Sequence, residues 1–115
     1  MRLRTDFWIG ALLRRAQAEG AFVAVARRGA SEAGAIFVAV DRRDGTFDLY
    51  GPAPQTELDG STGGRLFSQL LPGADETKLR ERIAQEVRFD SDLWLVEIED
   101  RQGRHFLDLA RDEPR

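Results

Sequence analysis

Two almost uninterrupted apolar segments in the first half of the chain constrain its fold more than any other feature. Residues 21–28 read AFVAVARR and residues 35–42 read AIFVAVDR, with the stretch GASEAG between them. Both segments are rich in β-branched and aromatic side chains, which favour strands. Because they lack the alternation of a strand with one wet face, we expect them to lie centrally in a sheet that is covered, at least in part, on both sides.

A third strand is predicted directly after these two. Asp44 and Gly45 form a strong turn signal, and residues 46–50 alternate between polar and apolar side chains as a half-exposed strand does. Because the three strands follow one another with short connections, we expect them to form an antiparallel meander.

The chain begins with an amphipathic helical pattern. Residues 6–18 repeat apolar side chains at helical spacing, with Thr5 or Asp6 as the N-cap and Gly20 as the residue that ends the helix. Gly10 weakens such a helix by about 1 kcal/mol relative to alanine, which suggests a packing reason for this glycine.

The second half of the chain contains one more helix and two more strands. Residues 75–88 are predicted to form a helix with Asp75 as its cap and a narrow apolar stripe. Residues 93–99 and 104–109 are predicted to form a hairpin around residues 100–103.

Two segments have no clear assignment to a helix or strand. Residues 65–71 read either as a short helix or as an irregular core segment, and the sequence leaves both open. Residues 51–64, rich in glycine and proline, are expected to form a long mobile loop, because loops of this length in compact domains are functional or mobile.

These elements predict one α+β domain over residues 1–115, in the order αβββ–αββ. We expect a mostly antiparallel five-stranded sheet with two helices packed on one of its faces, and frayed residues at the C-terminal end. A chain of 115 residues is long enough to bury a core without a metal ion or a disulfide. The absence of cysteine excludes disulfides, thiolate metal ligands and cysteine nucleophiles.

The location of the protein is predicted from what the sequence lacks. No apolar stretch approaches the roughly 20 residues that span a bilayer, and the first residues do not read as a signal peptide. We therefore expect a cytoplasmic protein that does not enter a membrane, and no motif calls for a cofactor.

Three parts of the sequence together resemble a known family. They are LRRA at 13–16 with GAF at 20–22, ARRG at 26–29 with AGA at 33–35, and RFDSDLW at 88–94 continuing into VEIED at 96–100 and GRHF at 103–106. This arrangement resembles a family of short alphaproteobacterial proteins that is classed only as a domain of unknown function. The resemblance covers most of the chain and is least distinct over residues 51–74. It implies a bacterial cytoplasmic protein of one domain, and it supplies no activity, cofactor or catalytic residue.

Charge divides the chain into a basic beginning and an acidic end. Residues 1–28 hold six arginines against two acids, whereas residues 75–115 hold twelve acids against eight bases. Guanidinium groups bind phosphates and carboxylates through paired hydrogen bonds. The candidate ligands of an anion or a protein partner are Arg14, Arg15, Arg27 and Arg28. The same arginines can instead pair with the acidic half of the domain or with a second copy of the chain.

Nucleic acid is an unfavoured partner, because the net charge of −3 opposes binding that depends on counterion release. Phe22 and Phe37 are predicted to lie in the core, where they cannot stack on bases. Trp94 is also expected in the core, whereas Trp8 is a candidate interface anchor. Weak nucleic-acid binding through the arginines is the third hypothesis.

The densest group of possible metal ligands lies near the C-terminus. Its members are Asp90, Asp92, Glu97, Glu99, Asp100, His105 and Asp108. Carboxylates of this kind hold Mg²⁺ or another hard cation. However, neither a calcium-loop pattern nor a His-Glu helix motif is present, so turn formation and pairing with arginines are the competing interpretation. His105 is the only histidine, and no serine lies in a nucleophile turn.

These observations favour a small protein-interaction or regulatory module without catalytic activity, whose partner is another protein or a second copy of the chain. The alternative is a divalent-metal or small-anion binding domain, with hydrolysis as one form of it, that uses the acids from Asp90 to Asp108 and His105.

Overall fold

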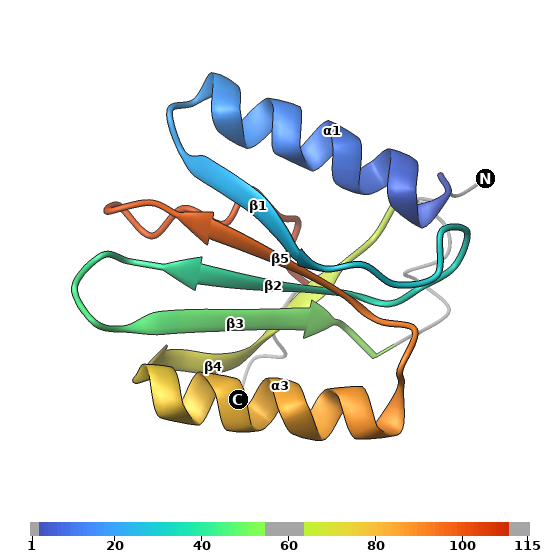
Figure 1. Cartoon of the computed structure of the whole chain (residues 1–115). Helices are drawn as coiled ribbons and strands as arrows, with labels where there is room; N and C mark the ends of the chain where they lie inside the picture. The colour runs from blue at the N-terminus through green and yellow to red at the C-terminus, as the bar shows by residue number, and fades with distance from the viewer. Residues whose placement is uncertain (1–2, 55–63, 111–115) are drawn as a thin grey trace.

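The computed structural model of the chain describes residues 3–54 and 64–110. Within these residues it contains two helices and five strands (Figure 1). In chain order they are α1 (Thr5–Ala18), β1 (Phe22–Arg27), β2 (Ile36–Asp41), β3 (Phe47–Pro52), β4 (Phe67–Ala74), α3 (Glu76–Phe89) and β5 (Trp94–Glu99). The predicted α+β class, both helices, the first three strands and the strand over residues 93–99, which is β5, are confirmed.

The strands form one mixed sheet in the order β1-β5-β2-β3-β4. β5 lies between β1 and β2, antiparallel to β1 and parallel to β2. The predicted meander is therefore wrong at its first step, whereas β2 and β3 do pair antiparallel. Four of the six β5 residues are buried: Trp94, Leu95, Val96 and Ile98. Only a position inside the sheet removes both faces and both edges of such a strand from water.

The helices lie on opposite faces of the sheet, so the prediction that both pack on one face is wrong (Figure 1). α1 packs Ile9 and Leu12 against one face, and α3 packs Leu79 and Ile83 against the other. Side chains of a strand alternate between the two faces. The residues of β2 therefore divide between two apolar clusters, and its continuous apolar sequence reflects a helix on each side.

The predicted strand over residues 104–109 is wrong, because this segment is irregular apart from one bridge between Leu109 and Phe67. Phe106 has a positive φ of 62°, which lies outside the strand region. Its carbonyl accepts a hydrogen bond from Arg15 over 2.6 Å, and its ring lies 5.3 Å from the guanidinium of Arg104. The place of the fifth strand is taken by β4, in the region that the sequence left open.

The ends of the elements follow the local sequence in most places. Gly20 has a φ of 93° after α1, and the Asp75 side chain accepts a hydrogen bond from the backbone of Lys78 over 2.8 Å at the start of α3. Thr5 does not cap α1, because its Oγ1 donates to the carbonyl of Gly34 over 2.9 Å.

The predicted loop over residues 51–64 begins later than expected, because Gly51 and Pro52 complete β3. The mobility predicted for residues 55–63 of this loop, and the fraying predicted for the last few residues, concern parts of the chain outside the described ones. Neither helix in residues 3–54 and 64–110 has the length and apolar character needed to cross a membrane.

Candidate functional site at the edge of strand β1

β1 forms one edge of the sheet and pairs with β5 alone. In the described part of the chain no strand is added to its other edge. Val23 and Val25 point to the α1 side, where they join the larger core cluster. An edge strand presents unpaired backbone N–H and C=O groups, and these are a template for pairing with another chain.

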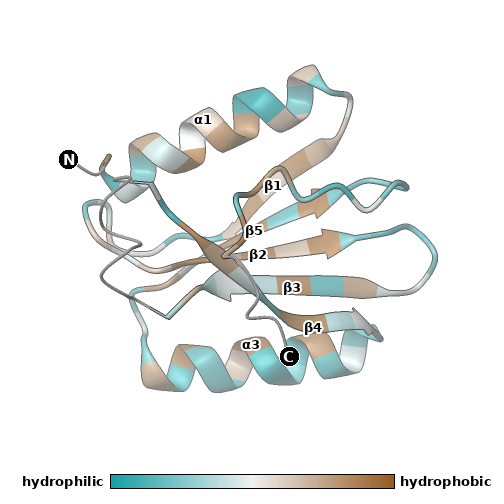
Figure 2. Cartoon of the chain, turned by 180° about the vertical axis from the view of Figure 1, so that it is seen from behind, coloured by the Kyte–Doolittle hydropathy of each residue, from teal (hydrophilic) through white to brown (hydrophobic). Residues whose placement is uncertain are grey.

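Phe22 lies on the opposite side of β1, where no helix covers it. In the register of the sheet Phe22 is paired with Glu99 and Ala24 with Glu97. α3 covers this face only over β3 and β4, which lie farthest from β1 in the strand order. Phe22 is therefore 65% exposed, and the prediction that it belongs to the core is wrong. Hydrophobic residues continue along much of β1 in spite of this exposure (Figure 2).

The other edge of the sheet, formed by β4, is protected in a way that β1 is not. The backbone N–H of Phe67 donates to the carbonyl of Asp108 over 2.9 Å, and the N–H of Ala110 donates to the carbonyl of Phe67 over 2.8 Å. β4 also contains Pro72, which has no N–H to offer. β1 has an irregularity between Val25 and Arg27, and bulges are one way of protecting an edge. Its residues from Phe22 to Val25, however, include neither a proline nor a charged side chain, which are other protections of this kind.

An open groove of about 320 Å³ lies beside Phe22. Its lining combines this ring with the two turns at the same end of the sheet: Gly20, Phe22, Arg43, Glu99, Asp100, Arg101 and Gln102. The guanidinium of Arg43 lies 3.8 Å from Glu99 and 3.4 Å from Asp41. Arg43 has a φ of 65°, a left-handed conformation that is uncommon for a residue other than glycine. The groove thus offers an aromatic surface next to both signs of charge.

The four candidate arginines do not form one contact. Arg15 donates to the carbonyl of Phe106, and Arg27 donates to the carbonyl of Ser91 over 2.8 Å. The guanidinium of Arg28 lies 5.0 Å from the centre of the Trp94 ring. Arg14 is exposed on α1, and among the described residues it has neither a hydrogen bond nor an ion pair. Three of the four therefore hold parts of the fold together, and only Arg14 projects without such a role.

The two tryptophans differ in burial. Trp94 is buried, and its indole N–H donates to the carbonyl of Ala30 over 2.8 Å, which confirms its predicted place in the core. Phe37 is also buried as predicted. Trp8, the candidate interface anchor, is half-buried, with its ring centre 5.4 Å from that of Phe67. Trp8 thus packs partly against the core of its own chain.

The candidate metal ligands point to separate partners. Glu97 pairs with Arg80 at 2.8 Å, Glu99 pairs with Arg43, Asp100 pairs with Arg104 at 2.8 Å, and Asp90 accepts a hydrogen bond from the backbone of Asp92. Asp108 is exposed. Within residues 3–54 and 64–110 no three His, Asp or Glu side chains converge as metal ligands do. The arginines around the acids supply the charge that a cation would otherwise supply.

Asp100 is the most buried of these acids, and it joins three segments. Arg104 donates to both of its carboxylate oxygens, over 3.1 and 2.8 Å, and also to the carbonyl of Glu19 at the end of α1. The hydrogen bonds from Arg104 hold the pKa of Asp100 below its ordinary value. This pair therefore ties the end of α1 to the end of β5.

His105 is held in a neutral, structural role. Its Nδ1 accepts a hydrogen bond from the backbone of Leu107 over 2.9 Å, and its ring centre lies 4.9 Å from that of Tyr50. Burial lowers the pKa of His105, and the charge of Asp48 opposes this shift in part. Because the lone pair of Nδ1 is already used, this atom is not available as a general base.

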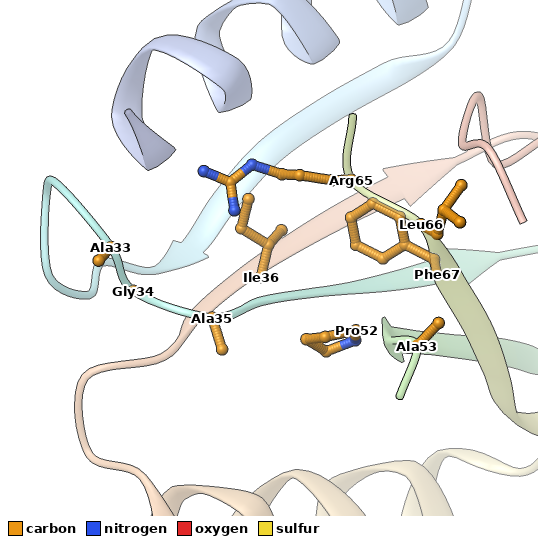
Figure 3. A pocket seen from close by; sticks show the side chains of 9 residues that line it. All are labelled: Ala33, Gly34, Ala35, Ile36, Pro52, Ala53, Arg65, Leu66 and Phe67. Carbon is orange, nitrogen blue, oxygen red and sulfur yellow. The ribbon is translucent and has the colours of Figure 1, made fainter. Parts of the chain in front are cut away.

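A smaller cavity of about 190 Å³ lies at the opposite end of the sheet, between β2, β3 and β4 (Figure 3). Most of the residues that line it have apolar side chains, with Ile36, Ala53 and Phe67 among them, and the guanidinium of Arg65 extends over Ile36 toward α1 (Figure 3). Arg65 donates to the carbonyl of Leu3 over 2.8 Å. No described residue that lines this cavity is an acid, a histidine or a hydroxyl side chain, so the lining offers no nucleophile or general base.

The sequence analysis missed the edge of β1 and its groove, although one signal was present. After Phe22, the alanines at positions 24 and 26 of β1 alternate with Val23 and Val25. Small side chains that alternate with larger ones indicate that the two faces of this strand are packed unequally. The two turns that complete the groove come from distant segments, so the sequence offered no signal for them.

Comparisons with known proteins agree on the fold and on the family. A family model described as "Protein of unknown function (DUF1491)" matches residues 3–108. The chain shares 42% sequence identity with a DUF1491 family protein from Caulobacter crescentus CB15. The crystal structure of that protein matches with a TM-score of 0.79 over 96% of this chain and 100% of that one. The solution structure of protein Atu0922 from A. tumefaciens is 44% identical, with a TM-score of 0.84, over 99% and 98%. No curated protein matches the chain.

Proposed function

We propose that this chain, which belongs to the DUF1491 family, is a protein-interaction module that binds its partner at the β1 edge surface. We define this surface as the unpaired edge of β1 with Phe22 and Ala24, together with the groove side chains Arg43, Glu99 and Arg101. The bound segment adds a strand to β1, and the groove receives the side chain that lies next to Phe22.

One observation carries this proposal: Phe22 is a strand residue that is 65% exposed on the half of the sheet that α3 leaves uncovered. Full burial of a phenylalanine side chain stabilises a complex by roughly 1.5–3 kcal/mol. Aromatic anchors surrounded by polar groups are typical of the centre of protein interfaces. Phe22, next to Arg43 and Glu99, has these surroundings.

The unpaired edge of β1 supplies the second part of the binding energy. A segment that pairs with an edge strand gains a row of backbone hydrogen bonds, and its alternate side chains are selected by the neighbouring pockets. Arg43 and Glu99 pair with each other in the free chain. A charged residue of the partner can therefore replace one member of this pair and form a new ion pair with the other. Recognition at this surface therefore depends on both shape and charge.

A role without catalysis is supported by the surroundings of the titratable residues. The Nδ1 of His105 already accepts a hydrogen bond, and Glu97 and Asp100 are paired with arginines. We include a cytoplasmic location in the proposal, which the cysteine-free sequence permits.

The proposal is tested by comparing two exposed phenylalanines. Phe22 and Phe89 are both strongly exposed, at 65% and 83%, but Phe89 ends α3 and lies outside the β1 edge surface. Wild-type chain, Phe22→Ser and Phe89→Ser are each immobilised and exposed to extract of an alphaproteobacterium that carries a family member. Retained proteins are identified by mass spectrometry.

We expect a protein that the wild type and Phe89→Ser retain and that Phe22→Ser loses. Circular dichroism and an unchanged unfolding midpoint establish that both variants are folded. If Phe22→Ser retains every protein that the wild type retains, and self-associates to the same extent, the β1 edge surface is not a binding site.

A further inference from the structure

We infer that the occupant of the β1 edge surface is a second copy of this chain, paired antiparallel through β1 across a two-fold axis near Ala24. This inference rests on the proposed function, because it names the partner of the same surface. Two five-stranded sheets would then form one continuous sheet of ten strands. The two α1 helices would lie side by side on one face of that sheet.

The orientation of α1 supports this arrangement. Successive residues of a helix turn by about 100°, so Gly10, Leu13 and Gln17 lie on one flank of the buried stripe, and Trp8 and Arg15 lie on the other. The flank of Trp8 and Arg15 faces the interior of the sheet, because Trp8 contacts Phe67 of β4 and Arg15 binds Phe106. The flank of Gly10, Leu13 and Gln17 therefore faces outward past the free edge of β1.

Gly10 lies level with Ala24. The N–H of Ala21 donates to the carbonyl of Ala16 over 3.1 Å, which sets these two residues at the same height. α1 and β1 run in opposite directions from there (Figure 1). Six helical residues from Ala16 reach Gly10 after about 9 Å, and three strand residues from Ala21 reach Ala24 after about 10 Å. A two-fold axis through the middle of β1 therefore brings the two Gly10 residues to the same level between the helices.

Among the described residues, nothing but Arg14 lies close to the position where Gly10 would carry a side chain. A Cβ added to it would meet only the end of the Arg14 side chain, at 3.5 Å. The packing reason that the sequence suggested for this glycine is therefore absent from the single copy. Glycine at the crossing point of two helices lets their backbones approach closely, and such an approach exists only when a second α1 is present.

In this register Ala24 faces Ala24 of the second copy, and Val23 of each copy faces Val25 of the other. These residues lie in the regular part of β1, because its register with β5 is continuous from Phe22 to Val25 and shifts only between Val25 and Arg27. None of the residues from Phe22 to Val25 is charged, so no repulsion between like charges opposes the joining of the two strands.

The absence of cysteine allows a direct test with single-cysteine variants. Residues directly opposite in an antiparallel pair have Cα atoms about 4.5–5.5 Å apart, which lies within the span of a disulfide. Ala24→Cys is oxidised gently and run on a non-reducing gel beside Ala84→Cys, a control at an exposed position of α3. We expect a covalent dimer from Ala24→Cys and monomer from Ala84→Cys.

Sedimentation velocity over a concentration series measures the unmodified dimer. Ala24→Lys and Ala24→Glu should each weaken self-association by about tenfold or more, because like charges across an interface oppose it, and an equal mixture of the two should restore it. Equal cross-linking of Ala24→Cys and Ala84→Cys, or a wild type that stays monomeric at its highest soluble concentration, overturns the inference. A monomeric wild type that still retains a different protein through Phe22 overturns the inference alone and leaves the proposed function standing.

Discussion

Among the glycines of the described residues, Gly29 has the least room for a Cβ, so its replacement by alanine is a direct test of the packing around it. A Cβ on Gly29 would overlap the carbonyl oxygen of Asp92 and lie 2.6 Å from the carbonyl carbon of Leu93. Both neighbours are backbone atoms, so no flexible side chain can move aside. The chain after β1 must therefore separate from the turn that precedes β5.

The loss of stability follows from two contributions. Overpacking against backbone destabilises by about 1–3 kcal/mol. The separation also weakens the 2.9 Å hydrogen bond from the N–H of Ala30 to the carbonyl of Asp92, and a bond of this kind contributes about 0.5–1.5 kcal/mol. We expect Gly29→Ala to lose roughly 2–4 kcal/mol in the free energy of unfolding, a large part of the roughly 5–15 kcal/mol of a typical domain.

The assay is urea unfolding followed by tryptophan fluorescence. Trp94 is a suitable probe, because its indole N–H binds the carbonyl of Ala30 next to the substituted residue. Gly10→Ala is the matched control in protein dilute enough to be monomeric, since there it adds the same methyl group where only a flexible side chain is near, and it should stabilise α1 by about 0.5–1 kcal/mol. Gly34→Ala, with contacts of 2.6–2.9 Å to backbone atoms, should also destabilise. If Gly29→Ala unfolds at the same urea concentration as the wild type, the close approach of these two segments is wrong.

Three further predictions concern the core and the charged pairs. Leu79 is the one buried residue of α3 among the described residues, so Leu79→Ala should lose about 2–5 kcal/mol in the free energy of unfolding, measured with urea. Leu109 is exposed, so Leu109→Ala should stay within about 0.5 kcal/mol of the wild type. Burial lowers the pKa of His105, so the unfolded chain binds a proton first as the pH falls below about 6.5. The free energy of unfolding should therefore decline below this pH in the wild type and not in His105→Gln. An equal dependence of the unfolding free energy on pH in both proteins would contradict this account. The pKa of Asp100 is lowered by Arg104, so the stability from this pair should be present above about pH 4 and be lost as the pH falls further. In a double-mutant cycle with Asp100→Asn and Arg104→Gln, the two losses should therefore not be additive at pH 7, and additive losses would show that the pair is not coupled.

Local chemistry allowed much of the fold to be predicted from the sequence. Asp75 and Gly20 mark helix ends through their own side-chain and backbone properties, and the turn at Asp44 and Gly45 joins β2 to β3 as expected. The apolar sequence of β2 also indicated cover on both faces, and the structure supplies a helix on each. For the site, the sequence pointed to four arginines as binding residues, but three of them (Arg15, Arg27 and Arg28) contact other parts of the same chain.

The remaining features depend on contacts between distant segments. Whether a strand lies at the edge or the centre of a sheet is set by what pairs with it, and the insertion of β5 between β1 and β2 is not encoded near either of them. The same insertion leaves β1 at the edge and Phe22 exposed, although the sequence of β1 reads as a buried strand. The sequence by itself thus determined the helices, the first three strands and the apolar character of the core. Only the tertiary structure decided the strand order, the side of each helix and the surface that is open to a partner, because these follow from long-range pairing that no local pattern records.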